Sequence, residues 1–108
     1  MKIDFEKQNC IQIKNLVRGL NPIMGAYCYI SGKKVKFWKI EKHDFKEFKN
    51  IDDLNIGTII ESDPKKGLFI KTIDGIIEVL EIQGENAKKM PISDFLRGNH
   101  IDIGTVCE

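Results

Sequence analysis

The sequence has no apolar run near the roughly 20 residues that a membrane-spanning helix needs. Its first ten residues, MKIDFEKQNC, lack the apolar centre of a secretory signal peptide. The three cysteines are widely spaced, without a C-x-x-C pair or a nearby pair of histidines, which argues against a disulfide framework and against a zinc site. We therefore expect a cytoplasmic protein with no membrane or metal partner, in which partly buried cysteines pack as small apolar side chains.

Residues that could form a catalytic site are also scarce. The only histidines, His43 and His100, lie in polar stretches beside turns, where surface histidines are more common than general bases. Asp52, Asp53 and Asp63 could be taken for catalytic carboxylates, but no nucleophile, metal-ligand set or phosphate-binding loop accompanies them. Carboxylates at such positions are usually turn residues. We expect that the chain is not an enzyme by itself.

What the sequence does contain is the composition of one ordinary globular domain. Its 108 residues are 42% hydrophobic and 31% charged, enough for a single core, and we predict one domain over residues 1–108. The net charge of +1 hides an asymmetry: residues 1–43 carry a net charge of +6, and residues 44–108 a net charge of −5. Such a distribution favours a polyanionic partner, or a partner that meets only the basic half.

The densest positive charge lies between residues 18 and 42. One acid, Glu41, and two aromatic residues, Phe37 and Trp38, lie among five lysines, which are Lys33, Lys34, Lys36, Lys39 and Lys42. A basic strand with interleaved aromatic residues is typical of a surface that binds a nucleic-acid backbone. The same lysines are typical of a solvated strand that protects a sheet edge against aggregation. Spacing alone favours the solvated strand.

An amphipathic helix opens the chain. From about residue 7 to residue 20 apolar side chains recur at helical spacing, at Cys10, Ile13, Leu16, Val17 and Leu20. Asn21-Pro22 ends the predicted helix, because proline has no amide hydrogen to donate and excludes the preceding residue from the α region.

Short strands with turn signals follow the helix. We predict a strand at residues 26–30, a two-residue turn at 31–32 and a return strand at 33–42. The alternation of apolar residues in the return strand changes parity between Phe37 and Trp38. A change of parity within one strand predicts a β-bulge or a strongly coiled strand at a barrel corner.

A polar surface excursion follows at residues 43–56, in which we expect one helical turn. After it, the pattern of short strands separated by turns resumes. The remaining predicted elements are, in order, strands after Gly57, Gly67 and Gly75, a loop at 83–90, a short helix capped by Ser93 and ended by Gly98, and a last strand at about 103–107. Strands this short must form a sandwich or close on themselves. We predict a mainly β fold, a small open OB-like Greek-key barrel with an N-terminal α-helix and a short C-terminal helical turn.

Several short motifs occur along nearly the whole chain in an order that one family shares. They are Arg-x-Leu-Asn-Pro, Gly-Ala-Tyr, Lys-hydrophobic-Lys-hydrophobic-Trp, Gly-x-Ile, Asp-Gly, a Leu-Gln-like pair, a Lys-Lys-x-Met-like piece and Asp-Phe-Leu-x-Gly, at residues 18–22, 25–27, 34–38, 57–59, 74–75, 82–83, 88–90 and 94–98. In this order the motifs resemble the C-terminal domain of methionyl-tRNA formyltransferase. The sequence departs from the family at Ile23-Met24, where Trp-Pro is frequent, and at Asn86, where a glycine is usual.

The resemblance implies an OB-like barrel that a linker joins to an N-terminal, Rossmann-like catalytic domain. The family enzyme transfers a formyl group from 10-formyltetrahydrofolate to the amino group of methionyl-tRNA. Nothing in this sequence matches that catalytic domain, which we expect to be absent from the chain. The resemblance therefore implies no cofactor bound by this domain, and two partners, which are initiator methionyl-tRNA and the N-terminal domain of the parent enzyme. Because Met1 begins a chain that matches only the second domain, we expect a piece cut from a longer protein rather than a natural fragment gene.

The resemblance also implies which residues would contact tRNA phosphates and hold the acceptor end over the catalytic domain. The first candidates are Lys33, Lys34, Lys36, Lys39 and Lys42, and the second are Arg18, Lys14, Lys88, Lys89 and Arg97. Alternation along a strand would place Lys34, Lys36 and Trp38 on one face, with Lys33 and Lys39 on the other unless a bulge intervenes. For Trp38, packing in the core or at its rim is favoured over stacking on a base.

Two alternatives remain open. The domain could be a structural C-terminal domain of another formyltransferase, which acts on formyltetrahydrofolate or a sugar nucleotide, although the motifs at 88–90 and 94–98 favour the tRNA enzyme. It could also be a free-standing OB-type binder of single-stranded nucleic acid. That function needs exposed aromatic residues, and one tryptophan with two tyrosines is a small supply.

Overall fold

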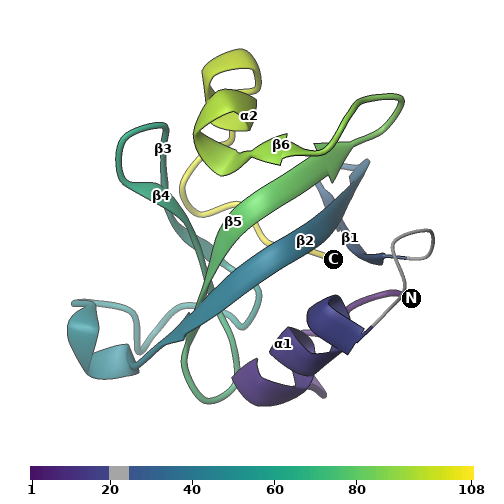
Figure 1. Cartoon of the computed structure of the whole chain (residues 1–108). Helices are drawn as coiled ribbons and strands as arrows, with labels where there is room; N and C mark the ends of the chain where they lie inside the picture. Colours follow the sequence, from purple (N-terminus) through teal and green to yellow (C-terminus); the bar gives the residue numbers. More distant parts are fainter. Residues whose placement is uncertain (20–24) are drawn as a thin grey trace.

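In the part of the chain that the structure describes, one antiparallel sheet of six strands flanked by two α-helices forms the fold (Figure 1). The structure is a computed structural model that describes residues 1–19 and 25–108. Its elements are α1 (Cys10–Gly19), β1 (Ala26–Ile30), β2 (Lys33–His43), the 3₁₀ turn η1 (Phe45–Glu47), β3 (Ile59–Asp63), β4 (Gly67–Lys71), β5 (Ile76–Gly84), β6 (Met90–Pro91) and α2 (Ile92–Gly98). Helix α1 packs against β2, and α2 packs against β5 and β6.

The strand order is β1-β2-β5-β4-β3, and β6 pairs with β5. Strands β3, β4 and β5 follow one another as hairpins, whereas β2 reaches β3 through the long connection at residues 44–58 and lies beside β5. This arrangement is a Greek key. The mainly β, open Greek-key fold predicted from the sequence is therefore confirmed.

The C-terminal segment bridges the two edge strands of the open sheet. Glu108 and Tyr29 exchange backbone hydrogen bonds of 2.8 and 3.4 Å on the β1 side. On the β3 side, the amide of Ile59 donates to the carbonyl of Thr105 at 2.8 Å. The segment thus pairs backbone groups of one residue on each edge strand, which shortens the edge that is open to another chain. The predicted last strand is wrong, because residues 103–104 form a turn and the segment makes one isolated bridge, between Thr58 and Val106.

Helix α1 begins at Cys10, three residues later than the periodicity predicts. The reason is a reciprocal cap: the Asn9 side chain accepts from the amide of Gln12 at 2.8 Å, and the Gln12 side chain accepts from the amide of Asn9 at 2.9 Å. This pairing satisfies two amides that a helix start would otherwise leave without a partner. Asp74 Oδ1 accepts from the amide of Cys10 at 2.9 Å and ties the helix to the β4–β5 turn. Leu20 and the predicted stop at Asn21-Pro22 lie outside the described residues.

The hairpin of β1 and β2 forms as predicted. Ser31 and Gly32 have φ angles of 53° and 78°, the positive values of the tight turn that suits the twist of an antiparallel pair. The pairing register between β2 and β5 shifts on both sides of Lys39, so the predicted bulge is also confirmed. In β1, Tyr27 and Tyr29 lie on the outer face, because the alternate residues are buried.

The core lies between α1, the inner face of the sheet and α2. Its largest fully buried side chains include Phe37, Ile3, Ile13, Ile59, Leu68, Ile70, Ile77 and Ile82. The three cysteines are buried among them, so they are more deeply placed than the partial burial expected from the sequence. The apolar stripe of α1 is confirmed by the burial of Cys10, Ile13 and Val17.

Two local predictions near the second helix are wrong in part. The loop predicted at 83–90 is confirmed at residues 85–89 but is shorter, because β5 continues to Gly84 and β6 begins at Met90, which pairs with Ile82. Helix α2 starts at Ile92 with Pro91 in the capping position, and no side chain caps it. Because the chain passes from β6 directly into the helix, Ser93 lies within the first turn instead of capping it.

The connection at residues 44–58 is a surface excursion with one 3₁₀ turn, as predicted. A side chain that the sequence did not single out holds it. The ammonium group of Lys71, whose residue is only 9% exposed, donates to the carbonyls of Ile51 at 2.7 Å, Asp52 at 3.3 Å and Leu54 at 2.8 Å. The cation thus satisfies backbone groups of an irregular segment that lack a strand partner.

Candidate nucleic-acid interface

A cleft of about 670 Å³ lies between α1, the middle of β2 and the end of β5. Its walls combine cationic, apolar and amide side chains, which are Lys14, Val17, Arg18, Trp38, Lys39, Ile40, Glu41, Gln83 and Lys89. We call it the Trp38 cleft. Four of the ten residues predicted to contact nucleic acid line it, namely Lys14, Arg18, Lys39 and Lys89.

Local structure explains why these residues meet. Lys14 and Arg18 are four residues apart on α1, so they lie on the same side of the helix. Trp38 and Lys39 are consecutive, and in a regular strand they would point to opposite faces. The register shift at Lys39 lets both line the same cleft. The bulge thus lies at the place where the aromatic ring and a lysine line the cleft together.

The indole of Trp38 is half-buried and held in place. Its Nε1–H donates to Gln83 Oε1 at 2.9 Å, and Gln83 Nε2 donates to the carbonyl of Ala87 at 2.8 Å. A Cβ atom added to Gly25 would lie 3.3 Å from the Trp38 ring, so the absence of a side chain at Gly25 allows the indole to lie close to the backbone immediately before β1. Gln83 was not among the site residues predicted from the sequence. The only signal in the sequence that could have identified Gln83 was the motif at residues 82–83.

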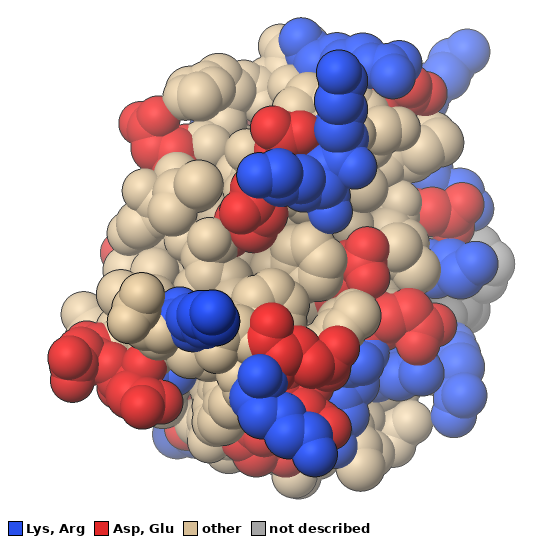
Figure 2. Space-filling model, turned by 90° about the vertical axis from the view of Figure 1, so that its left-hand side faces the viewer, with Lys and Arg blue, Asp and Glu red and all other residues tan. Residues whose placement is uncertain are grey.

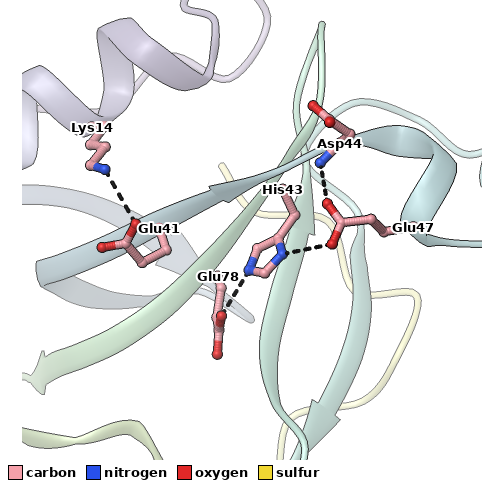
Figure 3. A network of polar contacts seen from close by, with 6 residues as sticks. All are labelled: Lys14, Glu41, His43, Asp44, Glu47 and Glu78. Carbon is pink, nitrogen blue, oxygen red and sulfur yellow. Dashed lines mark hydrogen bonds and ion pairs between the residues drawn. The ribbon is translucent and has the colours of Figure 1, made fainter.

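The cleft carries an excess of positive charge. Among the described residues that line it, Glu41 is the only acid, and it pairs with Lys14 across 3.2 Å (Figure 3). Both side chains are more than a third exposed, at 36% and 48%, so this ion pair contributes little to stability. Arg18, Lys39 and Lys89 remain to attract an anion. Lys89 Nζ lies 5.6 Å from the centre of the Trp38 ring.

The outer face of the hairpin extends this surface. Lys34 and Lys36 line a small hollow together with Gln83, Glu85 and Asn86, and Gln83 also belongs to the Trp38 cleft. The ammonium group of Lys34 lies 4.3 Å from the centre of the Tyr27 ring. As predicted, Lys34, Lys36 and Trp38 share one side of β2: Tyr27 pairs with Lys36, and both Lys36 and Trp38 approach Gly25.

The other predicted residues lie elsewhere. Lys33 is exposed beside α2, in a hollow that Phe95 and Asn99 also line. Lys42 approaches Gly75, at the far end of β2. Lys88 is exposed but does not line the cleft, and Arg97 pairs with Asp94 on α2 at 3.4 Å. The structure therefore divides the predicted set into a cleft group, a hairpin group and isolated surface cations.

The face that carries the β3–β4 hairpin and η1 differs in charge. Figure 2 shows that lysine, arginine and acidic side chains are interspersed there. Asp63 is a turn residue, as expected: its Oδ1 accepts from the amides of Lys65 and Lys66 at 2.7 and 3.2 Å. The hydrogen bond from Lys65 is the main reason that the pKa of Asp63 is lowered. This face provides matched control lysines for binding experiments.

His100 is exposed, as expected, but His43 is not a freely exposed histidine. Its Nε2 contacts Glu78 Oε1 at 2.8 Å and its Nδ1 contacts Glu47 Oε1 at 3.4 Å (Figure 3). The ring also packs edge-on against Phe48 and Phe69. The sequence could not reveal this cluster, because its members come from β2, η1, β4 and β5.

We expect the stability of the domain to depend on pH through His43. Partial burial opposes protonation of the ring, but hydrogen bonds to Glu78 and then Glu47 outweigh it, so the pKa of His43 is raised above 6.5 in the folded state. The stabilisation is fully present below the unfolded value of about 6.5 and is lost as pH rises through the folded pKa.

Chemical unfolding between about pH 5.5 and 9 measures this effect. Relative to the wild type, His43→Gln should lose the fall in unfolding free energy across this range, whereas His100→Gln should keep it. An unchanged pH profile in His43→Gln would contradict the assignment.

Within residues 1–19 and 25–108 no cluster of three or more His, Cys, Asp or Glu side chains is arranged to hold a metal ion. The helices in that part of the chain are too short to cross a membrane.

A sequence model of the formyl transferase C-terminal domain matches residues 1–100. The chain belongs to this family. It is 39% identical over 102 residues to methionyl-tRNA formyltransferase of Ruminiclostridium cellulolyticum, an alignment that covers 94% of this chain and 31% of the relative. The enzyme of the same name from Clostridioides difficile is 38% identical over 104 residues, covering 96% of this chain and 31% of the relative. The enzyme of the same name from Dictyoglomus thermophilum is 41% identical over 90 residues, covering 82% of this chain and 27% of the relative.

The chain thus spans less than a third of the length of the curated relatives that it matches. The resemblance deduced from the motifs is confirmed. The matched relatives are formyltransferases, so this domain type forms part of formyltransferase chains.

Proposed function

We propose that this chain is the tRNA-binding accessory domain of a methionyl-tRNA formyltransferase. In this proposal it holds initiator methionyl-tRNA by contacts to phosphates. A separate N-terminal catalytic domain then transfers the formyl group from 10-formyltetrahydrofolate. The domain itself binds no cofactor and performs no chemistry.

The observation that supports the proposal best is the gathering of Arg18, Lys39 and Lys89 at the Trp38 cleft, with Lys34 and Lys36 beside it. These cations come from a helix, a strand and a loop, and only one of the acids of the chain lines the cleft with them. Contacts to phosphate oxygens fix the position of a nucleic acid without reading its sequence. The choice of the initiator tRNA would therefore depend mainly on other parts of the parent enzyme.

Binding of fluorescently labelled tRNA, measured by anisotropy at about 50 and 200 mM salt, tests the proposal. We expect weak binding that falls steeply with salt, because phosphate contacts release counterions. An Arg18→Ala, Lys39→Ala, Lys89→Ala variant should lose about three units of the slope of log affinity against log salt. A Lys34→Ala, Lys36→Ala variant should lose about two.

The matched control is Lys65→Ala, Lys66→Ala in the β3–β4 turn, which removes two exposed lysines from the mixed-charge face. It should bind tRNA as the wild type does, apart from a small change in net charge. If the control and the cleft variant lose affinity equally, the phosphate contacts are not at the cleft. If the intact chain does not bind even at the lower salt concentration, the proposal is wrong and a purely structural function in the parent enzyme is favoured.

A further inference from the structure

Phosphate contacts alone do not require an aromatic wall or a concave site, yet the Trp38 cleft has both. Lysines on a flat or convex surface are sufficient to hold the backbone of a duplex. A volume of about 670 Å³ lies instead in the range of sites that enclose a small organic molecule. The shape indicates a ligand that enters the cleft, in addition to one that lies across it.

The walls indicate the chemistry of that ligand. Val17 and Ile40, which are 5% and 3% exposed, lie beside the half-buried indole of Trp38 and form an apolar side. Arg18, Lys39 and Lys89 supply positive charge at the same cleft. A ligand that satisfies both sides has a flat apolar part and an anionic part. A nucleotide has this combination, with a base that stacks on an aromatic ring and a phosphate that pairs with cations.

The aromatic wall is also pre-organised. The hydrogen bond from Trp38 to Gln83, and the bond from Gln83 to the carbonyl of Ala87, fix the indole before any ligand arrives. A ring that is already ordered loses little conformational entropy on binding. Lys89 Nζ, 5.6 Å from the ring centre, is on a flexible side chain that can leave the ring and pair with a phosphate.

We propose that the Trp38 cleft binds an unpaired nucleotide of an RNA strand, whose base stacks on the Trp38 indole while Arg18, Lys39 and Lys89 hold its phosphates. This inference deepens the proposed function, on which it rests: the domain would hold a single-stranded part of its tRNA as well as the phosphates of paired regions. A base in the duplex stack cannot enter the cleft, so the site selects unpaired residues.

Trp38 is the only tryptophan of the chain, so its fluorescence reports directly on the cleft. The test titrates the protein with three probes at low salt: a single-stranded RNA tetranucleotide, a blunt RNA duplex and inorganic tripolyphosphate. We expect the tetranucleotide to quench the fluorescence through stacking, and the other two probes to change it little. Tripolyphosphate could instead quench the fluorescence as strongly as the tetranucleotide does, or displace the tetranucleotide when both are added at the same concentration of charge. Either result would show an anion site without base recognition and would overturn the inference.

Variants measured with a labelled tetranucleotide by anisotropy complete the test. Trp38→Leu keeps an apolar side chain without a π face and should weaken binding about tenfold. Trp38→Phe keeps an aromatic ring and should weaken binding less than Trp38→Leu does. This difference separates loss of stacking from loss of folding. Gln83→Leu should weaken binding severalfold by freeing the indole, and Lys65→Ala, Lys66→Ala should leave it unchanged. Equal affinities of Trp38→Leu and wild type would overturn the inference.

The same variants separate this inference from the proposed function. Salt-dependent tRNA binding that Trp38→Leu does not alter, with no quenching by the tetranucleotide, would refute the cleft site and leave the proposed function standing. Binding of the tetranucleotide without binding of tRNA would support the cleft site and refute the proposed function. Absence of both would refute both.

Discussion

Replacement of Lys71 by methionine should destabilise the domain by about 2 to 3 kcal/mol, although methionine is apolar and of similar length. In the wild type the ammonium group donates to the carbonyls of Ile51, Asp52 and Leu54. Methionine has no donor, so all three carbonyls lose the ammonium group, and the buried carbonyl of Ile51 keeps only the amide of Leu54, which donates to it at 3.1 Å. An acceptor left without a partner costs about 1 to 3 kcal/mol, and the two partly buried carbonyls can recover part of that cost from water.

Urea unfolding of the variant measures the loss, and native-state hydrogen exchange locates it. We expect lower protection in residues 44–58 and near the amide of Gly57, which donates to the carbonyl of Lys71 at 2.8 Å. Lys66→Met, in an exposed turn, is the matched control and should change stability by less than about 0.5 kcal/mol. Similar stabilities for the two variants would contradict the anchoring function of Lys71. Among the described residues that line the Trp38 cleft, none belongs to the 44–58 connection, so the proposed tRNA binding should be unchanged in the folded variant.

The variant Phe37→Ala should lose about 3 to 5 kcal/mol, a large part of the stability of a small domain. Phe37 is fully buried on β2, where it pairs with Ala26 on one side and with Ile82 on the other. Truncation removes the transfer free energy of the ring and leaves a cavity that a sheet on both sides cannot close. It also acts one residue from the bulge that positions Trp38 and Lys39.

Thermal and urea unfolding, followed by far-ultraviolet circular dichroism, measure this effect. The control is Ile11→Ala, which truncates a large apolar side chain that is 55% exposed on α1. We expect the control to remain within about 0.5 kcal/mol of the wild type, because little apolar area is lost and alanine favours the helix. A Phe37→Ala variant as stable as Ile11→Ala would show that this side chain does not support the core.

The elements that are determined by neighbouring residues could be predicted from the sequence. The hairpin of β1 and β2 follows from the Ser31-Gly32 pair, in which glycine adopts positive φ without steric cost, and the bulge follows from a change of parity in the sequence at residues 37 and 38. The stripe of α1 follows from helical spacing. The boundaries were less predictable: the reciprocal cap of Asn9 and Gln12 depends on side-chain hydrogen bonds that compete with other positions for the helix start.

The candidate site was predictable in composition but not in arrangement. The sequence identified the cations, yet a list of ten residues does not show that Lys39 and Lys89, fifty residues apart, line one cleft, or that Lys42 and Arg97 lie away from it. Nor does it show that Gln83 orients the indole. These relations depend on the pairing of β2 with β5, a contact between distant segments.

By itself, the sequence determined the fold class and the family, because these depend on apolar spacing and motif order. Only the tertiary structure decided which cations converge, how His43 meets Glu47 and Glu78, and how Lys71 holds the 44–58 connection. Apart from the contact of His43 with Glu47, which are four residues apart, these are contacts between residues distant in the chain. Such contacts are fixed by the Greek-key order of the strands, and their energies are set by burial that appears only when the sheet has closed over its core.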